Sequence, residues 1–393
     1  MNETLGIGII GCGGRVRGLS RRTCRQDKRL RLVGVYDINP KSVESTRQFF
    51  SIPEYYAHTD REIKAYDSPE SLVSDPEIDW VMVGSWNAVH REHVVAAFEA
   101  GKHVFCEKPL ATTIEDCIAM RDAWQASGKQ FVIGFTLRFS PHYRKIKELI
   151  DAGVVGDIIS MEFNETLNFN HGGWIHDDWR SETKHAGTHL LEKCSHDIDL
   201  VNWMVGSRAS RVASFGGRDF FIPSNAYHME RLGTNERGDR AYKAMGSTRN
   251  RPDTDPFTRK GKDIVDNQVA IIEYENNVRA AFHTNCNAGI PERRMYILGT
   301  EGAIRADVLT GVIESKRIGF DTELIKHDTD ASGGHGGGDS VLAMELKDCM
   351  LNNGSPAAGL ADGLTSAVTC FGIDAAHAGG KVVDMKAFWR KLG

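Results

Sequence analysis

The first third of the chain alternates short apolar runs with polar segments of helical periodicity. Apolar runs typical of buried strands lie at residues 5–13, 30–39, 80–85, 103–109 and 130–139. The segments between them are compatible with helices. One begins at Pro40, another ends at Gly101, and Thr113 is a plausible N-cap for a third. This β-α-β-α order predicts a parallel, doubly wound sheet with helices on both faces.

The pattern changes after Arg138. A helix is predicted over residues 141–156, and longer runs that alternate apolar and polar residues follow it. They cover residues 157–169, 210–221, 266–286 and 292–318. Asn276 and Asn277 separate two strand-like halves, which indicates a hairpin. We therefore predict an α/β protein with a doubly wound domain over 1–136 and a second α/β domain, built on an antiparallel or mixed sheet, over 137–393.

Residues 223–263 interrupt the second domain with a polar stretch of little periodicity. So long a loop in a compact domain is usually a functional lid, an oligomer contact or a disordered segment. The pattern leaves these three alternatives open.

Composition narrows the class of protein. The chain has 393 residues, 41% hydrophobic and 26% charged, with a formal net charge of -5, which argues against nucleic acid or a membrane surface as a partner. No apolar run approaches the ~18 residues needed to span a bilayer. The beginning of the sequence lacks the pattern of a secretory signal, and the eight scattered cysteines form no C-x-x-C pair. We expect a cytoplasmic protein with reduced cysteines.

The first strand and turn carry a dinucleotide signal. Gly11-x-Gly13 follows the strand and opens a helix, where backbone amides can approach a pyrophosphate. Val16 occupies the position of the third glycine of the usual fingerprint. The second strand ends at Asp37, whose carboxylate can accept hydrogen bonds from a ribose and would repel a 2′-phosphate. NAD is therefore favoured over NADP.

The fourth apolar segment, residues 103–109, ends in Glu107-Lys108-Pro109. This places a carboxylate and an ammonium at the carboxyl edge of the sheet, where open α/β sheets bind ligands. A surface ion pair is the simpler alternative.

Together, the glycine turn, "EKPLA" at residues 107–111 and "RFSPHYRKIKELIDAGVVGDI" at residues 138–158 resemble the Gfo/Idh/MocA oxidoreductases. The resemblance covers essentially the whole chain. It implies an N-terminal, NAD-binding Rossmann domain over 1–136 and a C-terminal domain with a large open sheet that forms homodimer or homotetramer contacts. It also implies a sugar or cyclitol substrate, and that Lys108 is the active-site lysine. The expected cofactor-binding residues are Gly11, Gly13, Gly14, Arg15, Val16, Asp37, Ser85, Trp86, Asn87, His90, Glu107 and Lys108.

One predicted helix, around "LLEKCSHDIDLVNW" at residues 190–203, holds many titratable groups. The i+3 and i+4 steps align His189, Glu192, His196, Asp199 and Trp203 on one face. Asp199 is expected to pair or cap structurally and Trp203 to lie in the core. The other groups could ligate a metal, transfer a proton or pair as structural ions. The metal alternative uses His185, His189, Glu192 and His196.

The family usually has Asp-x-Gly-x-His here, whereas this chain has Glu192-Lys193-Cys194-Ser195-His196. By the resemblance, His196 is the general base, and no metal is needed. Lys108 would stabilise the alkoxide. Glu192 and Lys193 complete the expected catalytic set.

Further substrate contacts are expected outside this helix. Arg138 could bind an acidic group or cap the sheet. "WIHDDWR" at residues 174–180 brings Trp174, Trp179 and Arg180 together, either to stack on a sugar or to form a rigid turn. His335 lies in a glycine-rich segment that is either a substrate loop or a flexible connector.

The leading interpretation is an NAD-dependent oxidoreductase that acts on a secondary hydroxyl of a sugar, sugar derivative or cyclitol. A rival of the same family type keeps NAD bound and hydrolyses glycosides by transient oxidation and elimination. A metal-dependent hydrolase and a non-catalytic dinucleotide sensor are further alternatives. A sensor would have no need of Lys108 and His196.

Overall fold

The computed structural model describes residues 4–392, apart from residues 55 and 330–332. The described residues form two compact units. One contains the chain up to Ser140 together with 333–364, and the other contains 141–329 together with 365–392. The sequence predicts a single boundary near residue 137, and the chain first passes from one unit to the other after Ser140. The expected assignment of all of 137–393 to the second domain differs from the structure, because residues 333–364 return to the first unit.

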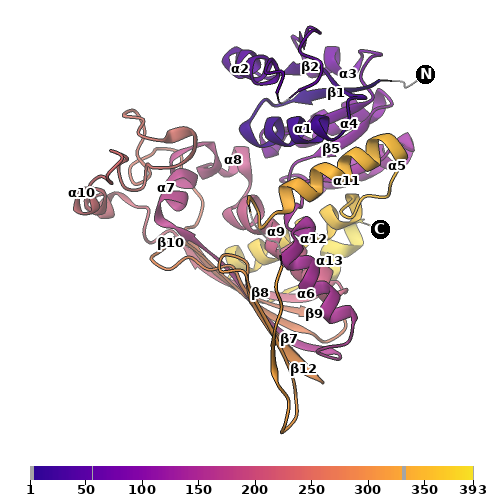
Figure 1. Ribbon diagram of the computed structural model, residues 1–393. Helices are drawn as coiled ribbons and strands as arrows, with labels where there is room; N and C mark the ends of the chain where they lie inside the picture. Colours follow the sequence, from indigo (N-terminus) through magenta and orange to yellow (C-terminus); the bar gives the residue numbers. More distant parts are fainter. Residues whose placement is uncertain (1–3, 55, 330–332, 393) are drawn as a thin grey trace. The chain divides into compact units, whose positions relative to one another are not determined.

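The first unit is built on a six-stranded parallel sheet in the order β3-β2-β1-β4-β5-β6. Helices lie on both sides of this sheet, which confirms the doubly wound arrangement (Figure 1). The strands are β1 (Leu5–Ile10), β2 (Leu30–Tyr36), β3 (Lys64–Ala65), β4 (Trp80–Val83), β5 (His103–Cys106) and β6 (Phe131–Ile133).

The helices of the first unit follow local sequence signals. Asn39 caps α2, with Pro40 in the first turn, and the Thr113 side chain accepts a hydrogen bond from the Asp116 amide at the start of α5. The helices are α1 (Gly14–Gln26), α2 (Pro40–Phe50), α3 (Pro69–Val73), α4 (His90–Glu99), α5 (Ile114–Ser127) and α11 (Gly338–Asn352), with short 3-10 helices η1 (Asn87–Val89) and η2 (Thr136–Phe139).

The second unit is built on a nine-stranded sheet in the order β14-β13-β12-β11-β7-β10-β9-β8-β15. Among its described pairings, β7 with β10 is parallel and the others are antiparallel. The predicted hairpin is present, with Asn277 at a φ of 66° in its turn. The strands are β7 (Ile158–Asn168), β8 (Ala209–Gly217), β9 (Asn267–Tyr274), β10 (Arg279–Ala288), β11 (Arg294–Gly299), β12 (Gly302–Asp307), β13 (Val312–Arg317), β14 (Leu324–Lys326) and β15 (Val383–Asp384).

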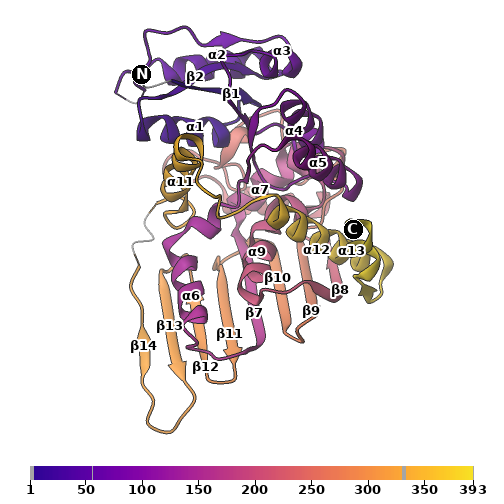
Figure 2. The same cartoon turned by 90° about the vertical axis from the view of Figure 1, so that its right-hand side faces the viewer.

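Helices cover one face of this sheet, with α6, α9 and α12 lying across it (Figure 2). They bury the apolar positions that alternate along the strands, such as Phe163 on β7 and Phe282 on β10. The helices of the unit are α6 (Pro141–Asp151), α7 (Phe169–Asp177), α8 (Thr183–Ala186), α9 (His189–Val205), α10 (Tyr227–Leu232), α12 (Leu360–Gly379, whose first residues belong to the other unit) and α13 (Lys386–Leu392). In the described chain, no helix combines the length and the hydropathy required to cross a bilayer.

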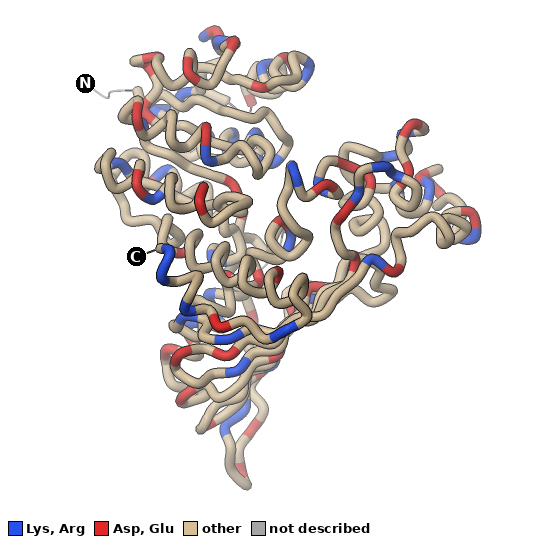
Figure 3. Tube along the Cα trace, turned by 180° about the vertical axis from the view of Figure 1, so that it is seen from behind, with Lys and Arg blue, Asp and Glu red and all other residues tan. Residues whose placement is uncertain are grey.

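Residues 218–264, called here the insertion, contain α10 and the short 3-10 helices η4 (Pro223–Asn225) and η5 (Gly246–Thr248). The insertion folds around buried aromatic residues, among them Phe221, Tyr242 and Phe257. Lysine, arginine, aspartate and glutamate are interspersed along it (Figure 3). Its side chains are therefore held in defined positions, which argues against the disordered alternative.

Candidate active site

The glycine turn of the first unit forms an open cradle at the beginning of α1. Gly11 has a φ of +85°, and a Cβ there would lie 2.3 Å from the Ser85 amide nitrogen. A Cβ on Gly14 would have no neighbour within 4 Å, and Gly13 caps α1 without any side-chain hydrogen bond. The first amides of α1 can therefore approach a pyrophosphate. These residues fit the dinucleotide.

Val16 stands where the fingerprint usually has its third glycine. In this chain the glycine at the close contact between helix and sheet lies on the sheet side, at Gly84. Val16 is fully buried, and a Cβ on Gly84 would lie 2.6 Å from the Cβ of Val16. Gly84 follows β4 directly and supplies the space that a glycine at position 16 would otherwise give. Val16 thus packs against Gly84 in the core, although it was expected among the cofactor-binding residues.

Asp37 lies directly after β2 and is oriented by two backbone amides. Its carboxylate accepts hydrogen bonds from the Cys12 amide at 2.7 Å and from the Asn39 amide at 2.8 Å. Each carboxylate oxygen can accept further hydrogen bonds, so the group can also bind a ribose. The neighbouring Ile38 is 72% exposed.

The end of β5 is tied to the glycine turn by an ion cluster. Arg15 donates through Nε to Glu107 Oε1 at 3.1 Å, and its other guanidinium nitrogens contact Asp339 and Thr136. His335 Nδ1 lies 3.2 Å from Asp339 Oδ1. Burial alone would raise the pKa of Asp339, but His335 and Arg15 outweigh it and lower that pKa.

This cluster shows where three of the predicted site residues lie. The Arg15 side chain, expected to contact the cofactor, is engaged by two carboxylates. His335, expected at the substrate, pairs with Asp339 at the beginning of α11. Glu107 is buried, and Lys108 follows it directly.

The loop after β4 contains the other expected cofactor residues. Trp86 is 37% exposed, Asn87 is buried, and Ser85 Oγ lies 2.8 Å from His93 Nδ1. His90 is fully buried, with Nδ1 2.9 Å from the Pro109 carbonyl and Nε2 3.2 Å from the Ser85 carbonyl. Burial lowers the pKa of His90. This imidazole joins the loop to the Glu107-Lys108-Pro109 segment and does not line a cofactor surface directly.

In the second unit, α9 confirms the predicted helix. Thr188 caps it by accepting a hydrogen bond from the Leu191 amide, and the Thr188 hydroxyl donates to Asp374 at 2.6 Å. Glu192 and His196 are both 6% exposed, and they are four residues apart on one face of the helix. Asp199 is buried and Trp203 is half-buried on the same helix.

A buried ion network surrounds Lys193. Its Nζ donates to Glu165 Oε1 at 2.7 Å, and Arg293 contacts the same oxygen at 3.0 Å. Arg293 also binds both oxygens of Asp197, at 2.8 and 2.7 Å. Burial would raise the pKa of Glu165, but Arg293 and Lys193 lower it to about 2. Burial raises the pKa of Asp197 to about 6 despite Arg293. Lys193 was predicted from the sequence, whereas its partners Glu165 and Arg293 were not.

Trp174, Trp179 and Arg180 do come together, as the sequence suggested. The Arg180 guanidinium lies 4.4 Å from the centroid of each indole system. Arg180 also pairs with Asp178 at 2.8 Å and with Glu192 on α9 at 3.2 Å. This arrangement links an aromatic surface to the helix that carries His196.

The metal alternative predicted that His185, His189, Glu192 and His196 converge. In the structure, His189 Nε2 contacts Thr284 Oγ1 at 3.4 Å and Cys286 Sγ at 3.6 Å, and burial lowers the pKa of His189 to about 4. Among the described residues, the group with metal-like spacing is instead Glu165, Cys194 and Asp197. Lys193 and Arg293 already neutralise its two carboxylates. All eight cysteines are free and buried.

Arg138, on η2 in the first unit, pairs with Asp362 at 2.8 Å and donates to the Ala357 carbonyl at 3.4 Å. It is 6% exposed. This environment favours the structural alternative over direct contact with an acidic substrate.

Two family matches cover most of the chain. Residues 5–135 match the oxidoreductase family with an NAD-binding Rossmann fold, and residues 143–305 match the GFO/IDH/MocA C-terminal domain. The chain belongs to the Gfo/Idh/MocA oxidoreductase family. The expected fold class and the NAD-binding Rossmann fold are thereby confirmed.

Curated relatives include inositol 2-dehydrogenase 3 of Saccharopolyspora erythraea, 32% identical over 206 residues, which cover 51% of this chain and 54% of the relative. The chain thus matches about half the length of such relatives. The Bacillus subtilis oxidoreductase YteT is 25% identical over 80% of this chain and 81% of its own.

Among solved structures, levoglucosan dehydrogenase in complex with NADH and levoglucosan aligns with a TM-score of 0.76 at 21% identity, over 97% of this chain and 99% of the other. Aldose-aldose oxidoreductase from Caulobacter crescentus aligns with a TM-score of 0.72 at 20% identity, over 97% and 100%. At these identities the likeness shows a shared fold.

Proposed function

We propose that this protein is an NAD-dependent oxidoreductase that acts on a secondary hydroxyl of a sugar, sugar derivative or cyclitol. The observation that carries the proposal is the ion pair between Arg15 of the glycine turn and Glu107. It holds the residue next to Lys108 against the dinucleotide cradle, at the sheet edge where α/β proteins bind ligands. The names of the relatives, which include inositol and levoglucosan dehydrogenases, support the substrate class.

Two side chains act on the substrate hydroxyl in this proposal. His196 accepts the proton of the substrate hydroxyl, and Lys108 donates a hydrogen bond to the same oxygen and stabilises its alkoxide character. Bound NAD would supply the acceptor for the hydride that leaves the substrate carbon. Glu192 and Lys193 act as positioning residues, because Arg180 and Glu165 respectively hold their charges.

The test is NADH formation with a panel of cyclitols and neutral sugars. His196→Ala should lower kcat by about 10²- to 10⁴-fold, the range for a lost general base. His377→Ala, near the end of α12, is a matched control in the same unit and should keep full activity. The reasoning is wrong if His196→Ala turns over like the control.

The redox-neutral glycosidase remains a second candidate because the Glu192-Lys193 pair departs from the family pattern. It would release sugar from glycosides with tightly bound NAD and no net NADH. Native mass spectrometry of the purified protein, followed by turnover of aryl glycosides, distinguishes the two activities.

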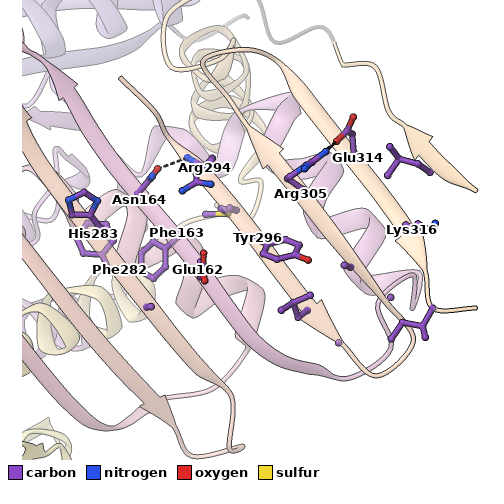
Figure 4. A pocket seen from close by; sticks show the side chains of 18 of the residues that line it. Glu162, Phe163, Asn164, Phe282, His283, Arg294, Tyr296, Arg305, Glu314 and Lys316 are labelled. Carbon is purple, nitrogen blue, oxygen red and sulfur yellow. Dashed lines mark hydrogen bonds and ion pairs between the residues drawn. The ribbon is translucent and has the colours of Figure 1, made fainter. Parts of the chain in front are cut away.

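We also propose that the uncovered face of the second sheet binds a second copy of the chain. This face carries exposed apolar residues, including Val269, Ile271, Tyr296 and Leu298. It is hollowed by a pocket of about 990 Å³, which Glu162, His283, Arg294 and Tyr296 help to line (Figure 4). A broad face of this kind, mixed in polarity and without covering helices, is typical of an interface between subunits.

A further inference from the structure

The insertion reaches the Trp174–Arg180 region through two adjacent residues, Gly246 and Ser247. The Ser247 hydroxyl accepts a hydrogen bond from Trp174 Nε1 at 3.3 Å and donates one to Asp178 Oδ2 at 3.3 Å. Asp178 in turn binds Arg180. One hydroxyl therefore connects the indole to the carboxylate that orients the guanidinium.

Gly246 lies directly against the same indole. Its φ is +69°, and a Cβ there would lie 2.2 Å from Trp174 Nε1 and 2.3 Å from Cδ1. No other residue type fits this position without moving the indole. Trp174 is thus in contact with both the insertion backbone and the Arg180 guanidinium.

The insertion is anchored well enough to act as a support. Lys243 is 3% exposed, lies 3.1 Å from Asp177 Oδ2, and donates to the Arg251 carbonyl at 2.6 Å. Arg249 binds both oxygens of Asp239 at 2.7 and 2.9 Å. Since Asp177 belongs to α7, the buried lysine joins the insertion to the helix that carries Trp174.

The supported surface is aromatic and balanced in charge. Arg180 faces two indoles and two carboxylates, Asp178 and Glu192. A substrate carboxylate would have to compete with both carboxylates for the guanidinium and would be repelled by them. An uncharged ring can place its C–H face on an indole and share hydroxyl hydrogen bonds with the same carboxylates.

We propose that Gly246 and Ser247 are specificity-determining positioning residues, which hold Trp174 and Arg180 as a platform for the uncharged ring of the substrate. The inference rests on the proposed function for the identity of the substrate class, but it concerns a different part of the molecule from the reacting groups. It makes the insertion the element that selects neutral polyhydroxy compounds over acidic ones.

The test compares Gly246→Ala with Gly238→Ala. Both glycines lie in the insertion at positive φ, +69° and +77°, but a Cβ at Gly238 has no neighbour within 4 Å. Backbone strain is therefore common to both variants, and displacement of the indole is specific to Gly246→Ala. Ser247→Ala removes the bridging hydroxyl without backbone strain, and Ser247→Thr should restore it.

Turnover and saturation-transfer NMR binding are measured on the NAD-loaded protein with matched pairs such as glucose and glucuronate, together with inositols. Gly246→Ala and Ser247→Ala should raise KM for neutral substrates roughly 5- to 30-fold, the factor that one to two kcal/mol of lost contact produces. The kcat and the affinity for NAD should change little. Preference for the neutral member of each pair should also fall.

The outcomes separate the two proposals. If sugars bind to the wild-type protein more tightly than to Gly246→Ala but none is oxidised, the platform proposal is supported and the oxidoreductase proposal fails. If wild-type protein oxidises sugars and Gly246→Ala matches Gly238→Ala, or the acidic member is preferred, the platform is refuted. Absence of binding to every sugar would overturn both.

Discussion

Replacing Arg293 with methionine tests whether the charges around the candidate catalytic helix are structural. Arg293 is 9% exposed and forms the bidentate pair with Asp197 as well as the contact with Glu165. In Arg293→Met, Lys193 still neutralises Glu165, so Asp197 becomes the buried carboxylate without a counter-ion. Breaking a buried pair in this way typically costs about 3–5 kcal/mol of unfolding free energy.

The cost should depend on pH with a definite sign. Burial already raises the pKa of Asp197 from an ordinary 3.8 to about 6, and loss of Arg293 should raise it further. A carboxyl group whose folded pKa lies above its unfolded value is most favourable to the folded state at low pH. That contribution is lost as the pH rises through the folded pKa. The destabilisation by Arg293→Met should therefore be largest near pH 8 and shrink towards pH 5.

Urea unfolding at both pH values measures the effect, with Arg294→Met as the matched control. Arg294 is the next residue, but its side chain is 51% exposed and pairs with Glu292 at 3.2 Å, so its loss should cost less than about 1 kcal/mol. Adding Asp197→Asn to Arg293→Met should recover part of the stability. If Arg293→Met and Arg294→Met lower the unfolding free energy by the same amount at either pH, the proposed buried network is refuted.

Two further predictions concern packing and assembly. Gly84→Ala should destabilise the first unit by about 1–3 kcal/mol and weaken NAD binding, because its Cβ would meet the Cβ and Cγ1 of Val16. Val16→Gly removes both of those atoms and should restore part of the stability and of the NAD binding; a double variant no better than Gly84→Ala would contradict this. Ile271→Asp on the uncovered sheet face should lower the mass measured by sedimentation, whereas Leu309→Asp, of similar exposure in a turn, should not. A wild-type monomer at micromolar concentration would exclude this interface.

Much of the fold was predictable because its signals are local. The strand-and-helix alternation of the first unit, the Asn276-Asn277 hairpin and α9 each rest on residues that are neighbours in the sequence. The short strands β3, β14 and β15 were missed. Each has only two or three residues, too few to show a period of two.

Glu165 was missed although the sequence carries a signal for it. Met161, Phe163, Glu165 and Leu167 alternate along β7 and are all buried. A charge at an inward position of an apolar stripe implies a buried partner, because an isolated ion costs too much to bury. Strict period-two analysis would have identified Glu165 as a buried ion, but it could not have identified Arg293 or Lys193 as the partners.

The ion-pair partners of these residues could not be predicted, because they come from distant parts of the sequence that only folding brings together. Asp339 contacts Arg15 from 324 positions away, and this contact belongs to the segment that the sequence analysis placed in the other domain. On α9, equally, spacing alone aligned Glu192 and His196 but could not show that Glu192 faces Arg180. Once these ion pairs are known, Glu192 and Lys193 no longer resemble free acids and bases. In the proposed mechanism, their contribution is to hold α9, and with it the imidazole of His196, in a single orientation through the pairs with Arg180 and Glu165.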